Sequence, residues 1–292
     1  MNQQQNQQQQ RREKAYRAGS RIARERMAVE APLDAEALSA VEASDVIVVQ
    51  GIYDHVELVL EALEMPHTRI VMPQLADIRL RPDQLLVINC PGNLSSPREL
   101  GRIRDFVAAG GSLFTTDWAL KNVVQAAFPG TIAYNERPTA DDVVRVEIRA
   151  QDNPFLTGVM GEHDDPQWWL EASSYPIVIE DATRVEVLLT SSELEARYGE
   201  APVAVLFKHG EGEVFHMISH YYLQRTELRS HRQSSAAENW AVEKGVAIDG
   251  ALSVDMAGIS LGEVESAGSS ARLFANVVAQ KKRRTIEKGK QS

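Results

Sequence analysis

Two short apolar runs, each followed at once by turn-forming or polar residues, constrain the fold of this chain more than any other feature. The first run is Leu85–Asn89, followed by Cys90-Pro91-Gly92-Asn93, and the second is Ser112–Thr116, followed by Asp117-Trp118. A helical pattern, 97–109, lies between them. Short aliphatic or β-branched runs bounded by turn formers are typical of buried parallel strands. Two such strands joined by a helix end at the same edge of one sheet, where ligands bind in open α/β folds.

The same alternation of strand and helix begins upstream of these two runs. Apolar runs at 45–50 and 68–72 flank a helical pattern at 54–63. This order predicts an α/β fold with a doubly wound, mostly parallel sheet. From residue 142 onward the apolar runs follow one another with little helix between them, so we expect an antiparallel β extension over about 142–200.

Charge divides the chain into a body and two tails. The 292 residues carry a net charge of −10, but residues 1–30 carry +4 and residues 281–292 carry +5, which leaves −19 for the residues between. We therefore expect one α/β domain over 31–280. The Gln-rich and then basic segment 1–30 and the basic segment 281–292 are expected to be disordered tails, although 11–27 is helix-permissive with a thin apolar stripe.

Composition excludes several classes of protein. One cysteine excludes an internal disulfide, and no apolar run approaches the ~20 residues that span a bilayer. The N-terminus lacks the apolar segment of a secretory signal, so a cytoplasmic location is expected. An acidic body repels nucleic acid, and such binding would have to come from the two basic tails.

Asp117 is the first catalytic candidate. It follows a predicted strand and precedes a predicted helix, which is the position of a nucleophile elbow. A carboxylate there can serve as nucleophile or general base. The alternative is that Asp117 only caps the following helix, a position that favours Asp.

His216 and His220 are the second and third catalytic candidates. They are four positions apart at the end of a predicted strand, so they share a face if the strand continues. Imidazoles at such an edge act as acid or base groups or bind metals. The alternative is a hydrogen-bonded histidine that orders the pocket. Because the spacing shows no third ligand, we expect no metal and no cofactor.

Residues that follow the other strands are candidates for ligand binding. Cys90 would be a reactive thiol only beside a positive charge, and otherwise a small buried apolar residue. Gly92 and Asn93 could offer donors to an anion. The full set of ligand-binding candidates is Tyr53, Asp54, His55, Asn89, Cys90, Gly92, Asn93, Trp118 and Tyr221.

Six segments between about Asp45 and Val278 resemble the class I glutamine amidotransferase-like superfamily, which has a flavodoxin-like fold. Within it they are most similar to the branch with trehalose-utilisation (ThuA-like) proteins and the GIFT domains of gliding and intraflagellar-transport proteins. The segments are VIVVQGIYDHVELVLE, LLVINCPG, IRDFVAAGGSLFTTDWAL, NPFLTGV, GEGEVFHMISH and RLFANVV.

The departures from that family decide the expected activity. Amidotransferases carry Cys at the elbow in a Gly-Xaa-Cys-Xaa-Gly pattern, where this chain has Asp117 within Thr115–Ala119. Their Phe-His-Pro-Glu segment corresponds to Phe215-His216, followed here by Met217-Ile218 in place of Pro-Glu. Without the thiolate no glutamyl thioester can form, so we do not expect glutaminase activity.

Three functions remain open from the sequence. The favoured one is a catalytically degenerate amidotransferase-like domain that binds a small ligand, a sugar or a peptide, or a protein partner. The second is a hydrolase-type enzyme that uses Asp117 with His216 or His220. The third is an adaptor that reaches nucleic acid or a membrane surface through the basic tails. A homo-oligomer is compatible with all three.

Overall fold

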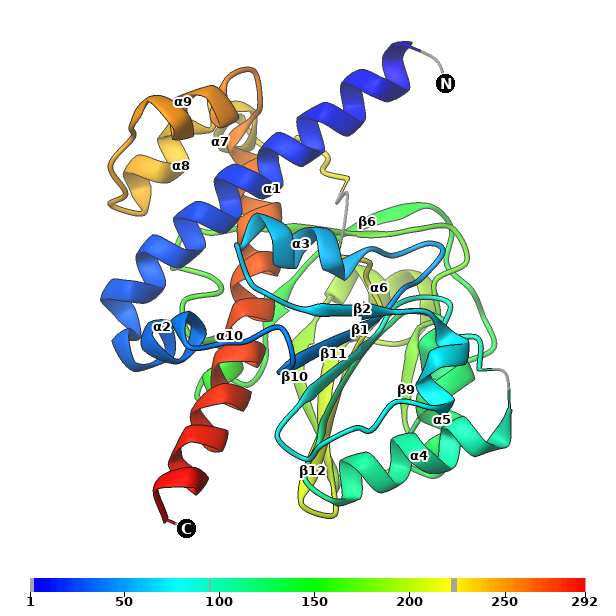
Figure 1. Cartoon of the computed structure of the whole chain (residues 1–292). Helices are drawn as coiled ribbons and strands as arrows, with labels where there is room; N and C mark the ends of the chain where they lie inside the picture. The colour runs from blue at the N-terminus through cyan, green and yellow to red at the C-terminus, as the bar shows by residue number, and fades with distance from the viewer. Residues whose placement is uncertain (1–2, 95, 222–224, 292) are drawn as a thin grey trace.

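A computed structural model describes residues 3–94, 96–221 and 225–291 (Figure 1). It is an α/β structure with an eight-stranded, mixed and mostly parallel sheet, in the order β2-β1-β3-β4-β12-β11-β10-β7. The first five strands in this order (β2, β1, β3, β4 and β12) are parallel to one another. Strands β11, β10 and β7 extend the sheet by antiparallel pairing. The strands are β1 (Val46–Val49), β2 (Thr68–Ile70), β3 (Leu85–Ile88), β4 (Ser112–Thr116), β7 (Glu147–Ile148), β10 (Val185–Thr190), β11 (Pro202–His209) and β12 (Gly212–Met217).

The rest of the expected antiparallel extension lies outside the main sheet. Strands β5 (Ile132–Tyr134) and β9 (Ile177–Ile179) form one two-stranded sheet, and β6 (Asp142–Arg145) and β8 (Gln167–Leu170) form another. Both pairs are antiparallel. The loop between β8 and β9 contacts the residue directly after β4, through hydrogen bonds from Ser174 and Tyr175 to Asp117. This loop therefore covers part of the carboxyl edge of the main sheet.

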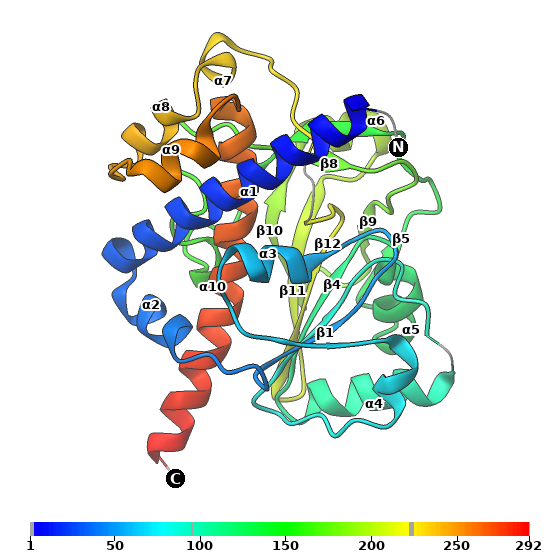
Figure 2. The same ribbon diagram turned by 45° about the horizontal axis from the view of Figure 1, so that its top comes forward.

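Helices cover both faces of the main sheet (Figure 2). Helix α4 (Pro97–Ala108) lies on one face, where it contacts β4 and β12, and α5 (Gln125–Ala127) follows a π-helical turn, Leu120–Val124, on the same side. The long helix α10 (Leu261–Gln291) crosses the other face. Its Phe274 packs on Phe114 of β4, with ring centroids 5.0 Å apart.

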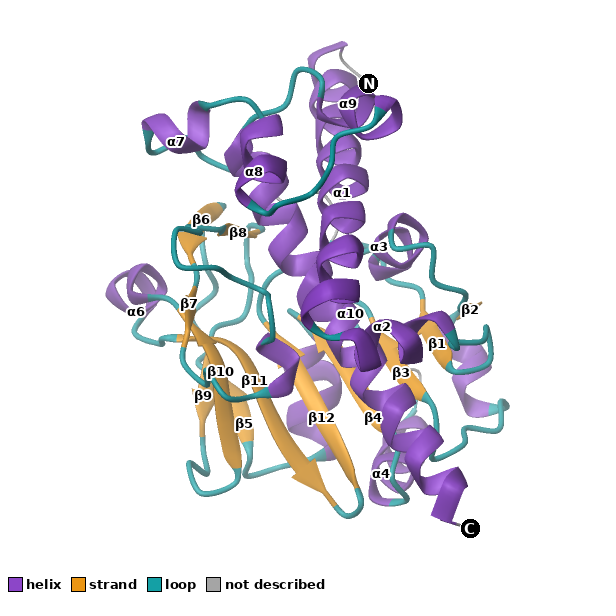
Figure 3. Ribbon diagram, turned by 90° about the vertical axis from the view of Figure 1, so that its left-hand side faces the viewer, coloured by secondary structure: helices purple, strands orange, loops and turns teal. Residues whose placement is uncertain are grey.

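Smaller helices complete the chain (Figure 3). Helix α2 packs on both α1 (Gln3–Glu30) and α10, α3 and α9 pack on α1, and α7 and α8 pack on α10. The bounds are α2 (Pro32–Ser39), α3 (Val56–Ala62), α6 (Ser192–Tyr198), α7 (His231–Ser234), α8 (Glu238–Glu243) and α9 (Gly250–Met256), with 3₁₀ turns at Met72–Ala76 and Pro154–Leu156.

The N-terminal segment corrects an expectation. Residues 3–30, predicted to be disordered, form helix α1, which packs along α10. A thin stripe that includes Tyr16, Ile22 and Met27 is buried. This thin stripe is enough to pack α1 on α10 because the two helices approach closely at Gly19 and Gly268. A Cβ on Gly19 would lie 2.6 Å from the Gly268 nitrogen.

The basic C-terminal segment is a second correction. The described residues of 281–292 continue helix α10 instead of forming a disordered tail. Lys282 pairs with Asp45 at 2.7 Å and Arg283 pairs with Asp34 at 2.8 Å. The positive charges at the end of the chain are thus partly neutralised by the acidic body. Across the described residues, no helix has the length and apolar character that crossing a membrane requires.

Candidate functional site

The carboxyl edge of the sheet brings together side chains from three separate strands. Cys90 follows β3, Asp117 follows β4, and His220 follows β12. Their sulfur, carboxylate oxygen and imidazole nitrogen all lie within 4.8 Å of one another, and all three residues are buried. We call Cys90, Asp117 and His220 the edge cluster. It forms here because β3, β4 and β12 are parallel neighbours in the sheet.

Asp117 has the backbone of a strand-to-helix elbow. Its φ is +45°, in the left-handed region that Asp tolerates better than most residues. Its side chain does not cap the following helix. Instead, Oδ1 accepts from the Tyr175 backbone N–H at 2.8 Å, and Oδ2 accepts from the Ser174 hydroxyl at 3.1 Å. The side chain therefore holds the loop between β8 and β9 against the edge of the sheet.

His220 lies between two carboxylates. Its Nε2 is 3.1 Å from Asp117 Oδ2, and its Nδ1 is 2.8 Å from Glu171 Oε2. Burial by itself would lower the pKa of His220, but the hydrogen bonds with Asp117, Cys90 and Glu171 outweigh burial and hold the pKa well above its ordinary value. Each ring nitrogen thus faces one carboxylate, an arrangement that favours the protonated imidazole.

Exposure differs along this chain of three groups. The side chains of Asp117 and His220 are 2% and 3% exposed, whereas that of Glu171 is 36% exposed. Burial raises the pKa of Asp117, and the hydrogen bond from His220 opposes that rise. Glu171 therefore connects the buried pair to solvent.

Cys90 completes the edge cluster as a neutral thiol. Its Sγ lies 3.9 Å from Asp117 Oδ2, and its backbone N–H donates to the Thr116 hydroxyl at 3.1 Å. Burial raises the pKa of Cys90 to about 11, with the Asp117 charge adding to the rise. A nucleophilic thiolate is not populated at neutral pH under these conditions.

A second polar network lies beside the edge cluster, at the carboxyl ends of β1 and β3. The Asn89 amide donates to Glu57 Oε2 at 2.9 Å, and His55 Nδ1 lies 3.2 Å from Glu57 Oε1. Asp54 Oδ1 accepts from the backbone N–H of His55 at 2.8 Å and of Tyr221 at 3.0 Å. These contacts fix the turn after β1 to the segment that carries His220, so Asp54, His55 and Asn89 support the site.

His216 does not join the edge cluster among the described residues. It lies within β12, pairs across the sheet with Thr115 of β4, and its Nδ1 is 2.8 Å from the Thr115 hydroxyl. The ring is fully buried, and burial lowers the pKa of His216 to about 3. The structure thus brings His220 to Asp117 and leaves His216, an uncharged histidine, inside the sheet.

An aromatic row lies over the same edge. Tyr53 and Trp118 meet edge to face at 5.2 Å, Trp118 stacks on Tyr175 at 5.6 Å, and Tyr175 stacks on Tyr134 at 3.8 Å. We call Tyr53, Trp118, Tyr175 and Tyr134 the aromatic row. Lys121 adds an ammonium group 5.5 Å from the Tyr134 ring. Tyr53 is 48% exposed, so the row reaches the surface.

The remaining ligand-binding candidates are placed differently from one another. Gly92 is buried with a φ of +64°, and a Cβ there would lie 2.8 Å from the Ala119 Cβ. Asn93 is exposed and accepts from the Asn122 amide at 3.0 Å. Tyr221 is buried with Phe114 at a centroid distance of 5.5 Å, so its ring belongs to the core.

Several residues of this edge were not predicted from the sequence. Glu171, Ser174 and Tyr175 come from the loop after β8, and Tyr134 comes from β5. The polar run Glu171–Tyr175 resembles an ordinary surface loop, and nothing in its spacing connects it to Asp117. The pairing of β5 with β9 places these residues at the edge.

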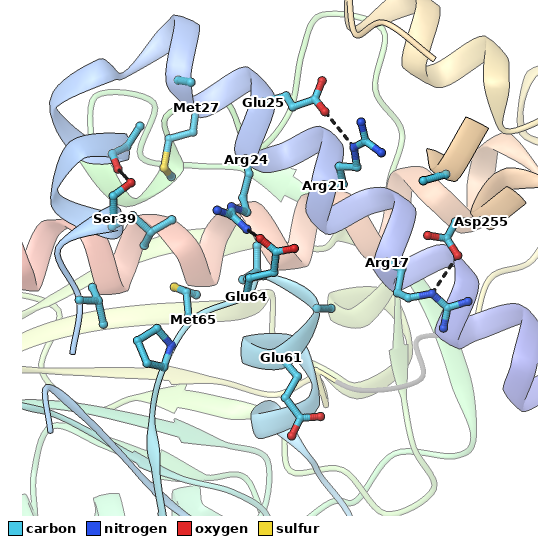
Figure 4. Close-up of a pocket in the computed structure, with 18 residues that line it drawn as sticks. Arg17, Arg21, Arg24, Glu25, Met27, Ser39, Glu61, Glu64, Met65 and Asp255 are labelled. Atoms are coloured by element: carbon cyan, nitrogen blue, oxygen red, sulfur yellow. Dashed lines mark hydrogen bonds and ion pairs between the residues drawn. The ribbon is translucent and has the colours of Figure 1, made fainter. Parts of the chain in front are cut away.

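A surface groove lies away from this edge (Figure 4). A groove of about 940 Å³ runs between α1, α2 and α3 and is lined by Arg17, Arg21 and Arg24. Each of these arginines already pairs with an acidic side chain: Asp255, Asp249 and Glu64, respectively. The groove therefore offers little uncompensated charge to a ligand.

Comparisons with known proteins return structures only. No family model and no curated protein matches the sequence. A cytoplasmic protein of Salmonella typhimurium is 14% identical, with 61% of this chain and 88% of that one covered and a TM-score of 0.44. A ThuA-like protein of Bacteroides uniformis is 12% identical, with 62% and 83% covered and a TM-score of 0.41.

Glycosidases also appear among the similar structures. An exo-β-1,4-mannosidase of an Opitutaceae bacterium is 12% identical, with 60% of this chain and 31% of that one covered and a TM-score of 0.42. The chain thus spans less than a third of the length of that enzyme. The site itself defines the class of protein: an α/β domain with a buried carboxylate–imidazole cluster beneath an aromatic row at the carboxyl edge of its sheet.

Proposed function

We propose that this protein is a catalytically degenerate amidotransferase-like domain that binds a small ligand with an apolar face, such as a sugar, on its aromatic row. The observation that carries the proposal is the aromatic row itself, which includes Trp118, the residue directly after the elbow. Aromatic rings stack on the apolar faces of sugars and of rings such as proline. A ligand on the row would lie directly above the edge cluster.

The parallel part of the sheet supports the family assignment. Its order, β2-β1-β3-β4-β12, follows the 2-1-3-4-5 pattern of flavodoxin-like folds. The elbow after β4 carries Asp117 in place of the family's cysteine. Cys90, after β3, is a neutral thiol and offers no substitute nucleophile.

The edge is also organised for binding before a ligand arrives. The Trp118 indole N–H donates to the Ser173 carbonyl at 2.7 Å, so the ring is held in place. Both oxygens of the Asp117 carboxylate already accept hydrogen bonds, from Ser174 and Tyr175. A fixed ring loses little conformational freedom on binding, whereas an occupied carboxylate is poorly placed to attack.

Ligand titration with a tryptophan variant tests the proposal. Wild type is titrated by calorimetry with a panel of mono- and oligosaccharides and proline-containing peptides. Trp118→Ala should weaken binding by about 2 kcal/mol, or about 30-fold, as loss of a central aromatic anchor does. Trp169→Ala is the matched control, because that half-buried ring faces Arg12 instead of the row. Equal weakening by both variants, or no binding by wild type, would contradict the proposal.

A hydrolase-type enzyme is the second candidate. One observation favours it: Asp117, at a left-handed elbow, contacts His220, and His220 contacts Glu171. A nucleophile, a base and an acid that orients the base are therefore in contact one after the other. In this case Asp117→Asn and His220→Gln should each abolish turnover of activated esters or glycosides. The Asn variant is nearly isosteric and tolerates the same φ, so retained turnover in that variant would exclude Asp117 as the nucleophile.

A further inference from the structure

We propose that the edge cluster is a binding site for one Zn²⁺ ion, with Cys90 Sγ, Asp117 Oδ2 and His220 Nε2 as ligands. From the sequence we expect no metal, because the spacing of the two histidines shows no third ligand. The tertiary structure supplies the other ligands from the ends of two neighbouring strands. This inference is independent of the proposed function, since it concerns buried groups beneath the aromatic row.

The distances between the three ligand atoms suit a tetrahedral ion. With Zn–N and Zn–O bonds of about 2.0 Å and Zn–S bonds of about 2.3 Å, neighbouring ligand atoms lie roughly 3.3–3.6 Å apart. Here the imidazole and carboxylate atoms are 3.1 Å apart, and the sulfur and carboxylate atoms are 3.9 Å apart. The sulfur and the imidazole nitrogen lie within 4.8 Å of each other, so shifts of about an ångström or less would bring all three to the same ion.

The kind of ligand atoms selects the metal. Thiolate and imidazole suit zinc and other late transition metals, whereas calcium and magnesium take oxygen ligands. The charges also balance, because a thiolate and a carboxylate together neutralise a divalent cation in this buried place. Metal binding releases the thiol proton of Cys90 and the Nε2 proton of His220.

The surroundings of His220 have the arrangement that a zinc-binding histidine needs. A metal-bound histidine characteristically donates its other ring N–H to a carboxylate, which fixes the ring and raises its basicity. Glu171 Oε2 lies 2.8 Å from His220 Nδ1 and plays this part. The Ser174 hydroxyl likewise orients the Asp117 carboxylate from 3.1 Å.

The three protein ligands leave a fourth position of the tetrahedron. Structural zinc sites are closed by four protein ligands, while sites with three protein ligands hold a water or a ligand atom in the fourth position. The buried, three-ligand set therefore belongs to the open type. The aromatic row above it would limit what reaches that position.

Cobalt substitution tests the site directly. The full-length, tag-free chain is freed of metal with a chelator and titrated with Co²⁺ under reducing conditions. Wild type should bind one equivalent, with a near-ultraviolet thiolate-to-cobalt absorption and the visible bands of a tetrahedral ion, and Zn²⁺ should displace both. Cys90→Ser should lose the thiolate absorption, while His67→Ala, which changes a half-buried histidine directly before β2, should keep it. Absence of the thiolate absorption in wild type, or its persistence in Cys90→Ser, would overturn the proposal.

A second variant keeps the test decisive if Cys90→Ser does not fold. Glu171 is partly exposed, so Glu171→Gln should leave the fold intact. Its zinc affinity, measured by competition with a chromophoric chelator, should fall 10- to 100-fold, which is the usual effect of losing a carboxylate behind a metal-bound histidine. An unchanged affinity in this variant would overturn the proposed geometry.

Discussion

The interior of β12 and its carboxyl end each carry a histidine, and the two histidines have opposite electrostatic surroundings. His216, inside the strand, is fully buried, and burial lowers its pKa to about 3 despite the opposing hydrogen bond with Thr115. His220, four residues later, is almost as buried but lies between Asp117 and Glu171, so its pKa is raised. Burial alone does not decide the charge of a histidine. Here the neighbouring carboxylates at the edge of the sheet decide whether a buried histidine is charged.

The largest expected effect is the loss of stability in acid that results from protonation of His216. Its folded pKa of about 3 lies below the ordinary 6.5, so its stabilising contribution is present above pH 6.5 and is lost as pH falls toward 3. At 1.36 kcal/mol per pKa unit, the loss reaches slightly over ~4 kcal/mol at pH 3 and about 2 kcal/mol at pH 5. Urea unfolding of wild type and His216→Leu across this range measures it. A variant that loses as much stability as wild type on acidification would refute this role.

Removal of Asp117 should have the next largest effect. Asp117→Ala leaves the His220 charge buried without its partner and places Ala at a φ of +45°, so we expect a loss of about 4 kcal/mol. Asp117→Asn avoids the backbone cost and should lose about 1 kcal/mol less. Chemical denaturation in the presence of a chelator compares the two. Equal losses would show that the left-handed backbone is not strained.

The pH dependence of His220 should run opposite to that of His216. Because its folded pKa is raised, its stabilisation is fully present below the unfolded value of 6.5 and is lost as pH rises through the folded pKa. His220→Gln should therefore destabilise the chelated protein more near pH 6 than near pH 9. Thermal unfolding at the two pH values checks the sign. A larger effect at high pH would mean that His220 is neutral in the fold.

Glu171 should contribute least to the stability of the metal-free protein. Its side chain is 36% exposed, so solvent screens its pair with His220, and Glu171→Gln should cost about 1 kcal/mol or less. Denaturation in chelator measures this. A loss as large as that of Asp117→Ala would contradict this prediction, because it would mean that Glu171 stabilises the fold as much as the buried Asp117 carboxylate does.

Much of the framework could be predicted from the sequence because it rests on local patterns. The run 112–116 is β4, and the runs 85–89, 45–50 and 68–72 contain β3, β1 and β2. The elbow at Asp117 was placed from the same alternation of apolar and turn-forming residues. Its role as a helix cap was the alternative, and the hydrogen bonds of its side chain to Ser174 and Tyr175 exclude that.

The helical layer was predicted less well, for a physical reason. Helix α1 has a polar sequence and only a thin apolar stripe, so its folding depends on a partner helix distant in sequence. Gly19 and Gly268 permit that contact, and neither glycine indicates it from local sequence. The basic residues at the end of α10 likewise pair with acidic residues distant in sequence, and their local sequence does not indicate those pairs.

The sequence by itself determined the strands, their common direction and hence the edge where polar residues would gather, because these follow from local periodicity and turn chemistry. Only the tertiary structure decided which of those residues meet. The parallel pairing of β12 with β4 and of β4 with β3 brings His220, Asp117 and Cys90 within 4.8 Å, and the β5–β9 pair adds Tyr134 and Tyr175. Contacts between strands far apart in sequence carry no local signature, so the cluster emerges only when the sheet is assembled.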